Sequence, residues 1–370
     1  MTNHQKYEPV IKRQQSFTNY DLSGIYPGNL ELYGHWITKL VKGNTWFGLN
    51  YDCRLSQVID NANDNFDTYV ITLHNEPVFI EDVEHMCRQR PNSLFVIVGD
   101  IFGSFPFDNC KLLTNFWFHK IIPYALSNTN IEFLEQRKYL LSSLVNQSSY
   151  YKTLVTSHLH KNYCNRNDLV WTWNTAQSNA NSKVRCFSMD LLDIETGYPI
   201  VDDLRNHYFQ NLKNTSRAYE VFLNEPILDF YSYGPIPDSC VNITNETFIN
   251  ETTDDIICPG PTITEKTWKP IITGTAMIPQ GQSKTYSMFE NFGFEFYYPW
   301  DKSYDLLTAD YDRLLGALGA IDYVMNNPDT VWKEVYDSCK YNFSWVRSPG
   351  FVKQVEELNE KFLEEFLLNY

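Results

Sequence analysis

Two short, largely apolar segments on either side of an amphipathic stretch constrain the fold of this chain more than any other feature. Residues 68–73, TYVITL, and residues 94–98, LFVIV, each predict a buried strand, and residues 80–90 between them fit a helix. Strands that are apolar along their whole length are typical of parallel sheets with helices on both faces. This part of the chain is therefore predicted to be an α/β unit.

The same alternation returns after residue 137. Residues 137–146, RKYLLSSLVN, are strand-like, and residues 146–162 fit a helix whose polar first residues could cap it. Further strands are expected at 169–173, 240–244 and 275–279, and further helices at 262–273, 285–291 and 303–326. Residues 174–218 are polar and irregular, and we interpret them as an insertion.

The length of the chain, 370 residues, suits two domains better than one compact core. The predicted fold class is α/β, with two Rossmann-like domains, parallel sheets and an interdomain cleft. We expect a first domain over residues 1–134, a second over 135–345, and an amphipathic helix over 346–370 that packs back on the body. Ligands of such folds bind at the carboxyl ends of the strands.

Composition narrows the classes of function. The net charge of −15 disfavours broad electrostatic attraction to nucleic acid or to an anionic membrane. No apolar run is long enough for a membrane span, and the N-terminal residues lack the apolar core of a signal peptide, so a cytoplasmic location is expected. The eight cysteines are scattered without a CxxC pair, which predicts reduced thiols and no structural zinc.

The segment from Thr262 to Asp305 carries the clearest chemistry. It is predicted to run from a helix start through a strand and a turn to a second helix. A helix N-terminus offers unpaired N–H groups and the positive end of the helix dipole, which suits a diphosphate. A lysine beside it adds positive charge, and a glutamate can accept hydrogen bonds from ribose hydroxyls. The candidate donor-binding residues of this segment are Thr264, Glu265, Lys266 and Thr267.

TEKTWKP followed by GTAMIPQG resembles the donor-site motif of GT-B glycosyltransferases related to the α-1,3-fucosyltransferases. It is also similar to phage and giant-virus glycosyltransferase-like proteins. The residues that carry the resemblance are Glu265, Lys266, Gly274, Gly281, Gly293, Phe294 and the segment 301–305. The resemblance covers residues 262–305 and, loosely, the strand and helix around 138–160. It includes no motif in residues 1–130.

The resemblance implies that Glu265 holds the ribose and Lys266 a phosphate of a UDP- or GDP-linked sugar, with no metal or other cofactor. In related enzymes the second domain opens with a strand, a polar loop and a helix with a basic residue that meets the phosphates. Here the loop would supply Asn146 and Ser148, and the basic residue would be Lys152. The family pattern has arginine there, and lysine cannot form the bidentate fork.

Simpler interpretations of the same residues stay open. Thr262–Ile–Thr–Glu265 fits a capping box, in which Glu265 bonds only the backbone of its own helix. Lys266 could be a plain surface residue, and Lys152 an exposed lysine on a capped helix. Glu246 follows the strand at 240–244 and either points into the donor site or is a solvated loop acid.

An inverting transferase needs a carboxylate or histidine that deprotonates the acceptor hydroxyl. His74 and Glu76 follow the first predicted strand, and Asp100 follows the second, so these three are the candidate catalytic residues. Asp100 is equally a turn or helix cap, and Glu76 before Pro77 fits a turn acid. A retaining mechanism stays open.

Two patterns that resemble metal sites are rejected on helical geometry. Asp310 and Asp312 match an Asp-x-Asp motif but fall in a predicted helix, where residues two apart point in different directions. We interpret them as a solvated helix face. His158 and His160 fail as a metal pair for the same reason.

The expected partners are a nucleotide-sugar donor and a hydroxyl acceptor. The acceptor would be a glycan or, as the viral look-alikes suggest, a hydroxymethylated pyrimidine in phage DNA, reached by base flipping. The acidic charge disfavours DNA, while the basic and aromatic residues Lys39, Lys42, Trp46 and Arg54 permit it. The alternatives are a non-catalytic nucleotide- or glycan-binding protein that keeps the fold, and a structural protein.

Overall fold

The computed structural model describes residues 45–50, 67–73, 80–99, 105–114, 131–145, 149–173, 190–217, 234–246, 252–253, 256–257 and 260–355, together with 357 and 361. The chain divides into two compact units, each of which is described by itself. Unit 1 comprises Met1–Ser127, Glu251–Thr262 and Val352–Tyr370, and unit 2 comprises Asn128–Asn250 and Ile263–Phe351.

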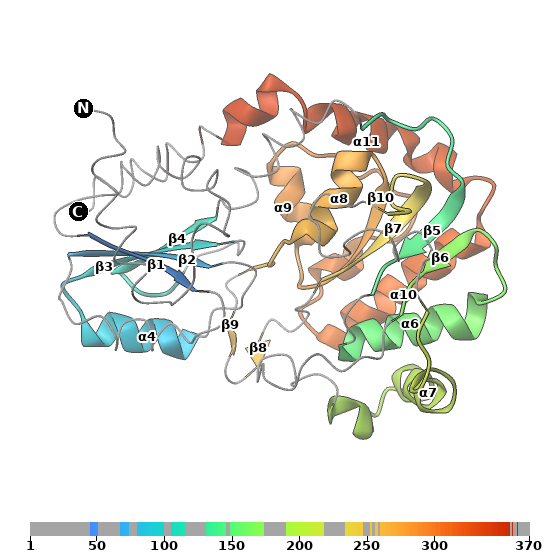
Figure 1. The fold of residues 1–370 in the computed structure, drawn as a ribbon, viewed down its shortest axis with the longest axis horizontal. Coiled ribbons are helices and arrows are strands. Elements are labelled where there is room, and N and C mark those ends of the chain that lie inside the picture. The colour runs from blue at the N-terminus through green and yellow to red at the C-terminus, as the bar shows by residue number, and fades with distance from the viewer. Residues whose placement is uncertain are drawn as a thin grey trace. The chain divides into compact units, whose positions relative to one another are not determined.

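Unit 1 contains a parallel sheet whose strands follow one another in chain order. The strands are β1 (Thr45–Asn50), β2 (Thr68–Leu73), β3 (Leu94–Gly99) and β4 (Cys110–Thr114), and helix α4 (Ile80–Gln89) connects β2 to β3 (Figure 1). The predicted strands at 68–73 and 94–98 and the helix at 80–90 are confirmed. Two residue pairs, Thr252–Thr253 (β8) and Ile256–Ile257 (β9), form a small antiparallel ladder in this unit.

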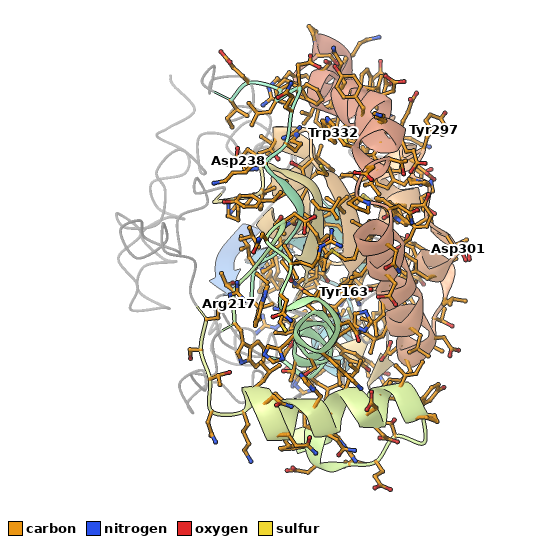
Figure 2. All side chains as sticks on the ribbon, turned by 90° about the vertical axis from the view of Figure 1, so that its right-hand side faces the viewer. Tyr163, Arg217, Asp238, Tyr297, Asp301 and Trp332 are labelled. Atoms are coloured by element: carbon orange, nitrogen blue, oxygen red, sulfur yellow. The ribbon has the colours of Figure 1, made fainter. Side chains whose placement is uncertain are left out.

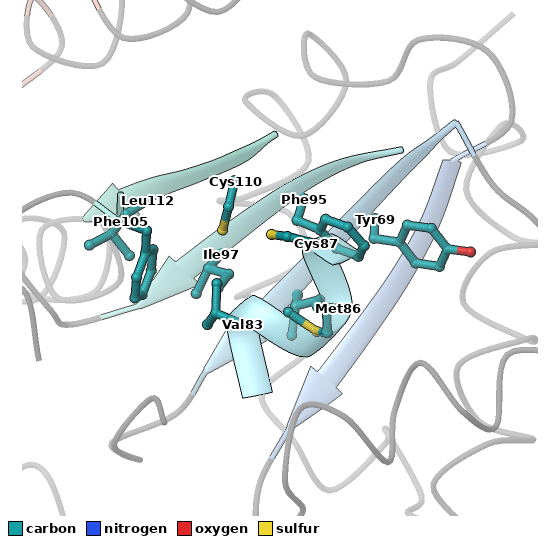
Figure 3. Packing of buried hydrophobic residues seen from close by; sticks show 10 residues of the cluster. Tyr69, Val83, Met86, Cys87, Phe95, Ile97, Phe105, Cys110 and Leu112 are labelled. Atoms are coloured by element: carbon teal, nitrogen blue, oxygen red, sulfur yellow. The ribbon is translucent and has the colours of Figure 1, made fainter. Parts of the chain in front are cut away.

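The core of unit 1 lies between α4 and the sheet. Val83, Met86 and Cys87 of α4 pack with Tyr69 and Phe95, whose rings stack with centroids 5.2 Å apart (Figure 3). The remaining members of the cluster are Ile71, Ile97, Phe105, Cys110 and Leu112. Burying each large apolar side chain stabilises the fold by roughly 1.5–3 kcal/mol, which explains why continuously apolar segments become inner strands.

Unit 2 contains a second parallel sheet, in the order β10-β7-β5-β6. Its strands are β5 (Tyr139–Ser143), β6 (Leu169–Trp171), β7 (Ser239–Asn245) and β10 (Ala276–Gln280), which confirms the strands predicted around these positions. Helices α8 (Glu265–Thr273) and α11 (Val331–Trp345) lie on one side of the sheet, and α6 (Tyr150–Tyr163) and α10 (Asp310–Asn326) lie on the other (Figure 1). The unit is a Rossmann-like α/β fold.

The strand order of unit 2 identifies where its topology reverses. Counted along the chain, its strands lie in the order second, first, third, fourth, so the chain moves outward from β5 to β6 and then returns to place β7 on the other side of β5. Open α/β sheets bind their ligands outside the carboxyl ends of the strands at such a reversal point. In unit 2 that point is the carboxyl ends of β5 and β7, at Ser143 and Asn245.

The interpretation of residues 174–218 as irregular is wrong for its second half. Residues Pro199–His207 form α7, which continues into η4, a π-helix over Tyr208–Leu212, and a short 3-10 helix η3 spans Asp190–Asp193. Figure 2 looks along α6, with Tyr163 labelled at its end and α7 crossing it. Pro199 occupies the first position of α7, a standard helix start, but Arg205 is buried on its inner face and weakens the apolar pattern.

Helix α11 does not appear among the sequence predictions because its buried stripe is partly polar. Ser338 and Asn342 lie on that stripe beside Val335 and Cys339. Asn342 exchanges hydrogen bonds with the backbone of Glu295, at 2.8 and 2.6 Å, and Ser338 accepts one from the Tyr297 amide at 3.0 Å. The backbone around Glu295 and Tyr297 belongs to no helix or strand, and these two polar side chains supply its hydrogen-bond partners. Because polar residues occupy part of the buried stripe, α11 lacks a clear apolar periodicity.

The helix predicted over 303–326 is interrupted. Residues Ser303–Leu306 form a separate 3-10 helix, η6, and α10 begins only at Asp310. The short helix expected at 285–291 is present as α9 (Thr285–Asn291). At the C-terminal side, residues 349–355 are helical, and Phe351 is fully buried in unit 2. In the parts of the chain that are described, no helix has the length and apolar character that crossing a membrane requires.

Candidate functional site

A buried carboxylate joins the end of β7 to the start of α8. Glu246 is the residue after β7 and is only 3% exposed. Its Oε1 accepts hydrogen bonds from the Thr264 amide at 3.1 Å and the Thr267 hydroxyl at 2.5 Å, and its Oε2 accepts one from the Thr264 hydroxyl at 2.6 Å. The interpretation of Glu246 as a solvated loop acid is therefore wrong. The carboxylate fixes the N-terminus of α8 at the carboxyl edge of the sheet.

Helix α8 begins at Glu265, and its N-cap is Thr264, whose side chain accepts from the Lys266 amide. A capping box from Thr262 to Glu265 would need Thr262 at the N-cap, so that interpretation is wrong. The N-cap lies two residues later than a capping box would place it, because Glu246 holds Thr264 in place. The side chain of Glu265 lies outside the described residues.

The bonding at this helix start limits how a phosphate could bind there. The hydroxyls of Thr264 and Thr267 each have one proton, and both protons are donated to Glu246. A phosphate that accepted from either hydroxyl would have to displace the carboxylate. Lys266 is half-buried at the same helix start, with its Nζ 3.2 Å from Thr264 Oγ1.

Helix α6 follows β5 at the neighbouring strand end. Lys152, the third residue of α6, is 5% exposed, so the expectation of an exposed lysine is wrong. Within the described part of the chain, the Ser149 side chain at the N-cap makes no capping hydrogen bond, although its carbonyl accepts from the Thr153 amide and hydroxyl. The loop candidates Asn146 and Ser148 lie outside the described residues.

A second buried carboxylate caps α9. Asp305 accepts hydrogen bonds from the amides of Thr285 at 3.1 Å and Tyr286 at 2.8 Å. Burial raises the pKa of the Asp305 carboxyl to about 7, against the opposing effects of these two amides and of the nearby Arg313 charge. The resemblance to the glycosyltransferase donor site includes the segment 301–305 but gives Asp305 no capping role. Because Asp305 caps α9, residues 303–309 are not part of the continuous helix that the sequence predicted over 303–326.

Arg313 holds the turn after β10. Its Nε donates to the Gly281 carbonyl at 2.9 Å, and its guanidinium also bonds the Leu307 carbonyl and Asp310. Asp310 accepts in addition from the Tyr151 hydroxyl at 3.2 Å, so only Asp312 matches the solvated face expected for this pair. Sequence reasoning missed Arg313 because nothing local marks an arginine inside a helix as buried.

The two histidines of the rejected metal pattern have separate partners. His158 lies 2.6 Å from Asp322, and Nδ1 of His160 lies 2.9 Å from Nε2 of His207 on α7. Among the described residues, no group of three or more histidine, cysteine, aspartate or glutamate side chains could hold a metal ion. Burial lowers the pKa of both His160 and His207.

The candidate catalytic residues His74, Glu76 and Asp100 lie outside the described residues. The strands that precede them are described and end at Leu73 and Gly99. Comparisons with protein-family models, with curated proteins and with solved structures gave no match to this chain.

Proposed function

We propose that this protein is a glycosyltransferase of the GT-B type that transfers a sugar from a nucleotide diphosphate to a hydroxyl acceptor. The observation that carries the proposal is the position of Lys266. It lies at the N-terminus of α8, which the Glu246 carboxylate holds against the carboxyl end of β7. That strand end belongs to the reversal point of a Rossmann-like sheet, where such folds bind nucleotides.

The proposed residue roles follow the resemblance, except where the bonding of the described residues gives a residue another role. Lys266 binds the diphosphate of the donor, and Glu265 accepts hydrogen bonds from its ribose. Glu246, Thr264 and Thr267 already bond one another, so in the proposal they position the start of α8. Lys152, Asn146 and Ser148 belong to the neighbouring strand–loop–helix, where they would meet the phosphates.

Unit 1 is the proposed acceptor domain and unit 2 the proposed donor domain. In this assignment His74, Glu76 and Asp100, which follow β2 and β3, are the candidates for the base that deprotonates the acceptor. The acceptor is a glycan or a hydroxymethylated pyrimidine of viral DNA. The proposal needs no resident metal, since lysine and the helix dipole would supply the positive charge at the diphosphate.

A thermal-shift screen of UDP-, GDP-, dTDP- and ADP-linked sugars tests donor binding. A donor present at 100 times its Kd stabilises the folded protein by about 2.7 kcal/mol, which appears as a clear rise in Tm. An unchanged Tm with every nucleotide sugar would contradict the proposal and favour a structural protein.

A second assay separates the enzyme from a binding protein that keeps the fold. Incubation with the donor identified in the screen should release the nucleotide diphosphate, slowly to water and faster with a hydroxyl acceptor. Measurable donor binding without release under either condition would favour the non-catalytic alternative.

A further inference from the structure

Three polar side chains form a row across the carboxyl ends of adjacent strands in unit 2. Ser143 ends β5, Asn245 ends β7 and Gln280 ends β10. Gln280 pairs with Asn245 in the sheet register, and Ser143 pairs with Ile243, two residues before Asn245. Paired residues of neighbouring strands, and residues two apart on one strand, share a face of the sheet. The row therefore lies on one face, across the reversal point.

The hydrogen-bonding capacity of this row is only partly used. The Asn245 amide nitrogen donates to Ser143 Oγ at 3.0 Å and lies 3.4 Å from the Ile243 carbonyl. In the described part of the chain, neither Asn245 Oδ1 nor the two polar atoms of the Gln280 amide has a hydrogen-bond partner. Both residues are at most 3% exposed. Buried amides without partners destabilise a fold, so stability does not explain why glutamine stands at position 280.

The row adjoins the proposed donor site through the backbone. The Glu246 amide donates to the Gln280 carbonyl at 3.0 Å, and the Glu246 side chain caps α8. Gln280 is thus one hydrogen bond away from the residue that positions Lys266. The unpartnered amides and the proposed diphosphate-binding lysine belong to the same edge of the sheet.

The chemistry of the unused groups selects the kind of ligand. The Gln280 amide offers one donor group and one acceptor, and Asn245 offers a further acceptor. A phosphate presents only acceptor oxygens, which would be repelled by the acceptor oxygens of the Asn245 and Gln280 amides. Sugar hydroxyls both donate and accept and carry no charge, so they complement the row. We propose that Gln280 and Asn245 bind hydroxyl groups of a sugar ring of the nucleotide-sugar donor.

This inference rests on the proposed function and adds a subsite to it. The hydroxyls belong either to the transferred sugar or to the ribose of the nucleotide. Because both side chains are nearly fully buried, the proposed binding requires that they become accessible to the sugar.

The test uses the full-length variant Gln280→Met, which keeps the size of the side chain and removes the unpartnered amide. Without ligand, Gln280→Met should melt at the temperature of the wild type or above it, because a buried amide without partners is removed. Its affinity for the nucleotide sugar that binds the wild type, measured by titration calorimetry, should fall at least about tenfold. The control is Gln282→Met, a substitution at another buried glutamine of the turn after β10, which should leave donor affinity close to that of the wild type.

A comparison of several titrated ligands shows which hydroxyl groups the two amides bind. If Gln280→Met weakens the nucleotide sugar and leaves the free nucleotide diphosphate unchanged, the hydroxyls are those of the transferred sugar. If both ligands weaken equally, and the 2′-deoxynucleotide binds both proteins equally weakly, the hydroxyls are those of the ribose. Both results support the inference.

Three results would overturn it. If the wild type binds no nucleotide sugar, both the proposed function and this subsite are wrong. A wild type that binds one, with Gln280→Met binding it equally well, removes the subsite and leaves the proposed function in place. A variant that melts well below the wild type, or does not fold, makes Gln280 a structural residue.

Discussion

The carboxylate of Glu246 accepts a hydrogen bond from the backbone amide of Thr264 at 3.1 Å, and this contact ties the end of β7 to the beginning of α8. The two residues are 18 positions apart in the chain. Glu246 also accepts from the Thr264 and Thr267 hydroxyls, so one buried carboxylate satisfies three donors at the helix start. A helix N-terminus stabilises a negative charge placed there, which compensates part of the cost of burying it.

Replacing Glu246 should destabilise unit 2. Glu246→Ala leaves the Thr264 amide and two hydroxyls without their acceptor, and we expect a loss of roughly 2–4 kcal/mol of unfolding free energy. The control variant Thr267→Val removes only one of the three hydrogen bonds and should cost about 1 kcal/mol. Urea unfolding of the three proteins measures both values. Equal midpoints for Glu246→Ala and the wild type would show that the carboxylate contributes nothing to the fold.

Replacing the residues that open α8 should weaken donor binding more than it weakens the fold. Lys266→Ala and Glu265→Ala are each expected to lose ~1–3 kcal/mol of nucleotide affinity, the range for hydrogen bonds to charged groups. Because Glu265 is the first residue of the helix, and not the third, its removal should change stability by less than about 1 kcal/mol.

Lys269→Ala is the matched control for Lys266→Ala, since Lys269 lies on the same helix and is also half-buried. Calorimetric titration with the nucleotide identified by the thermal-shift screen should give wild-type affinity for this control. A loss of stability in Glu265→Ala or Lys266→Ala without a change in affinity would make these residues structural.

The stability of unit 2 should depend on the protonation of Asp305. Burial raises its pKa in the folded protein from 3.8 to about 7, so the folded state keeps this proton over a pH range where the unfolded state has lost it. The resulting stabilisation is complete below about pH 4 and is lost as the pH rises to about 7, by on the order of 4 kcal/mol at most.

Asp305→Asn removes this titration. The difference in urea midpoint between wild type and variant should therefore shift against the wild type as the pH rises from 5 to 7.5, a range set by the pKa of about 7. A difference that moved in favour of the wild type over this range would contradict the raised pKa.

The end of α8 requires glycine for two separable reasons. Gly274 has φ of 65°, and a Cβ atom there would lie 2.5 Å from Cδ2 of Phe133. Gly197 has φ of 75°, with no atom within 4 Å of the position of a Cβ. Gly197→Ala should therefore cost only the left-handed backbone strain, about 1–2 kcal/mol, and Gly274→Ala should cost about 1–3 kcal/mol more. Thermal unfolding compares the two, and equal losses would show that Phe133 moves aside freely.

The sequence alone predicted β2 and β3 of unit 1 and the four sheet strands of unit 2, because their signal is local, but it did not predict β1 or β4. TYVITL is largely apolar and LFVIV is apolar along its length, so both segments are expected to be buried in any fold of this chain. The break before α10 and the whole of α11 were not predictable in this way. Asp305 accepts a hydrogen bond from the start of α9, and this contact interrupts the helix predicted over 303–326. Ser338 and Asn342 lie on the buried side of α11 and accept hydrogen bonds from the irregular backbone near Glu295.

For the candidate site, the sequence determined which residues carry charge and where they stand relative to a strand or a helix. It placed Glu246 after a strand and Lys266 at a helix start. Only the tertiary structure decided that Glu246 is buried against Thr264, that Lys152 is buried, and that Asn245 and Gln280 share one face. The physical reason is that apolar periodicity acts within one segment, whereas the partners of a polar group depend on which strands become neighbours in the sheet.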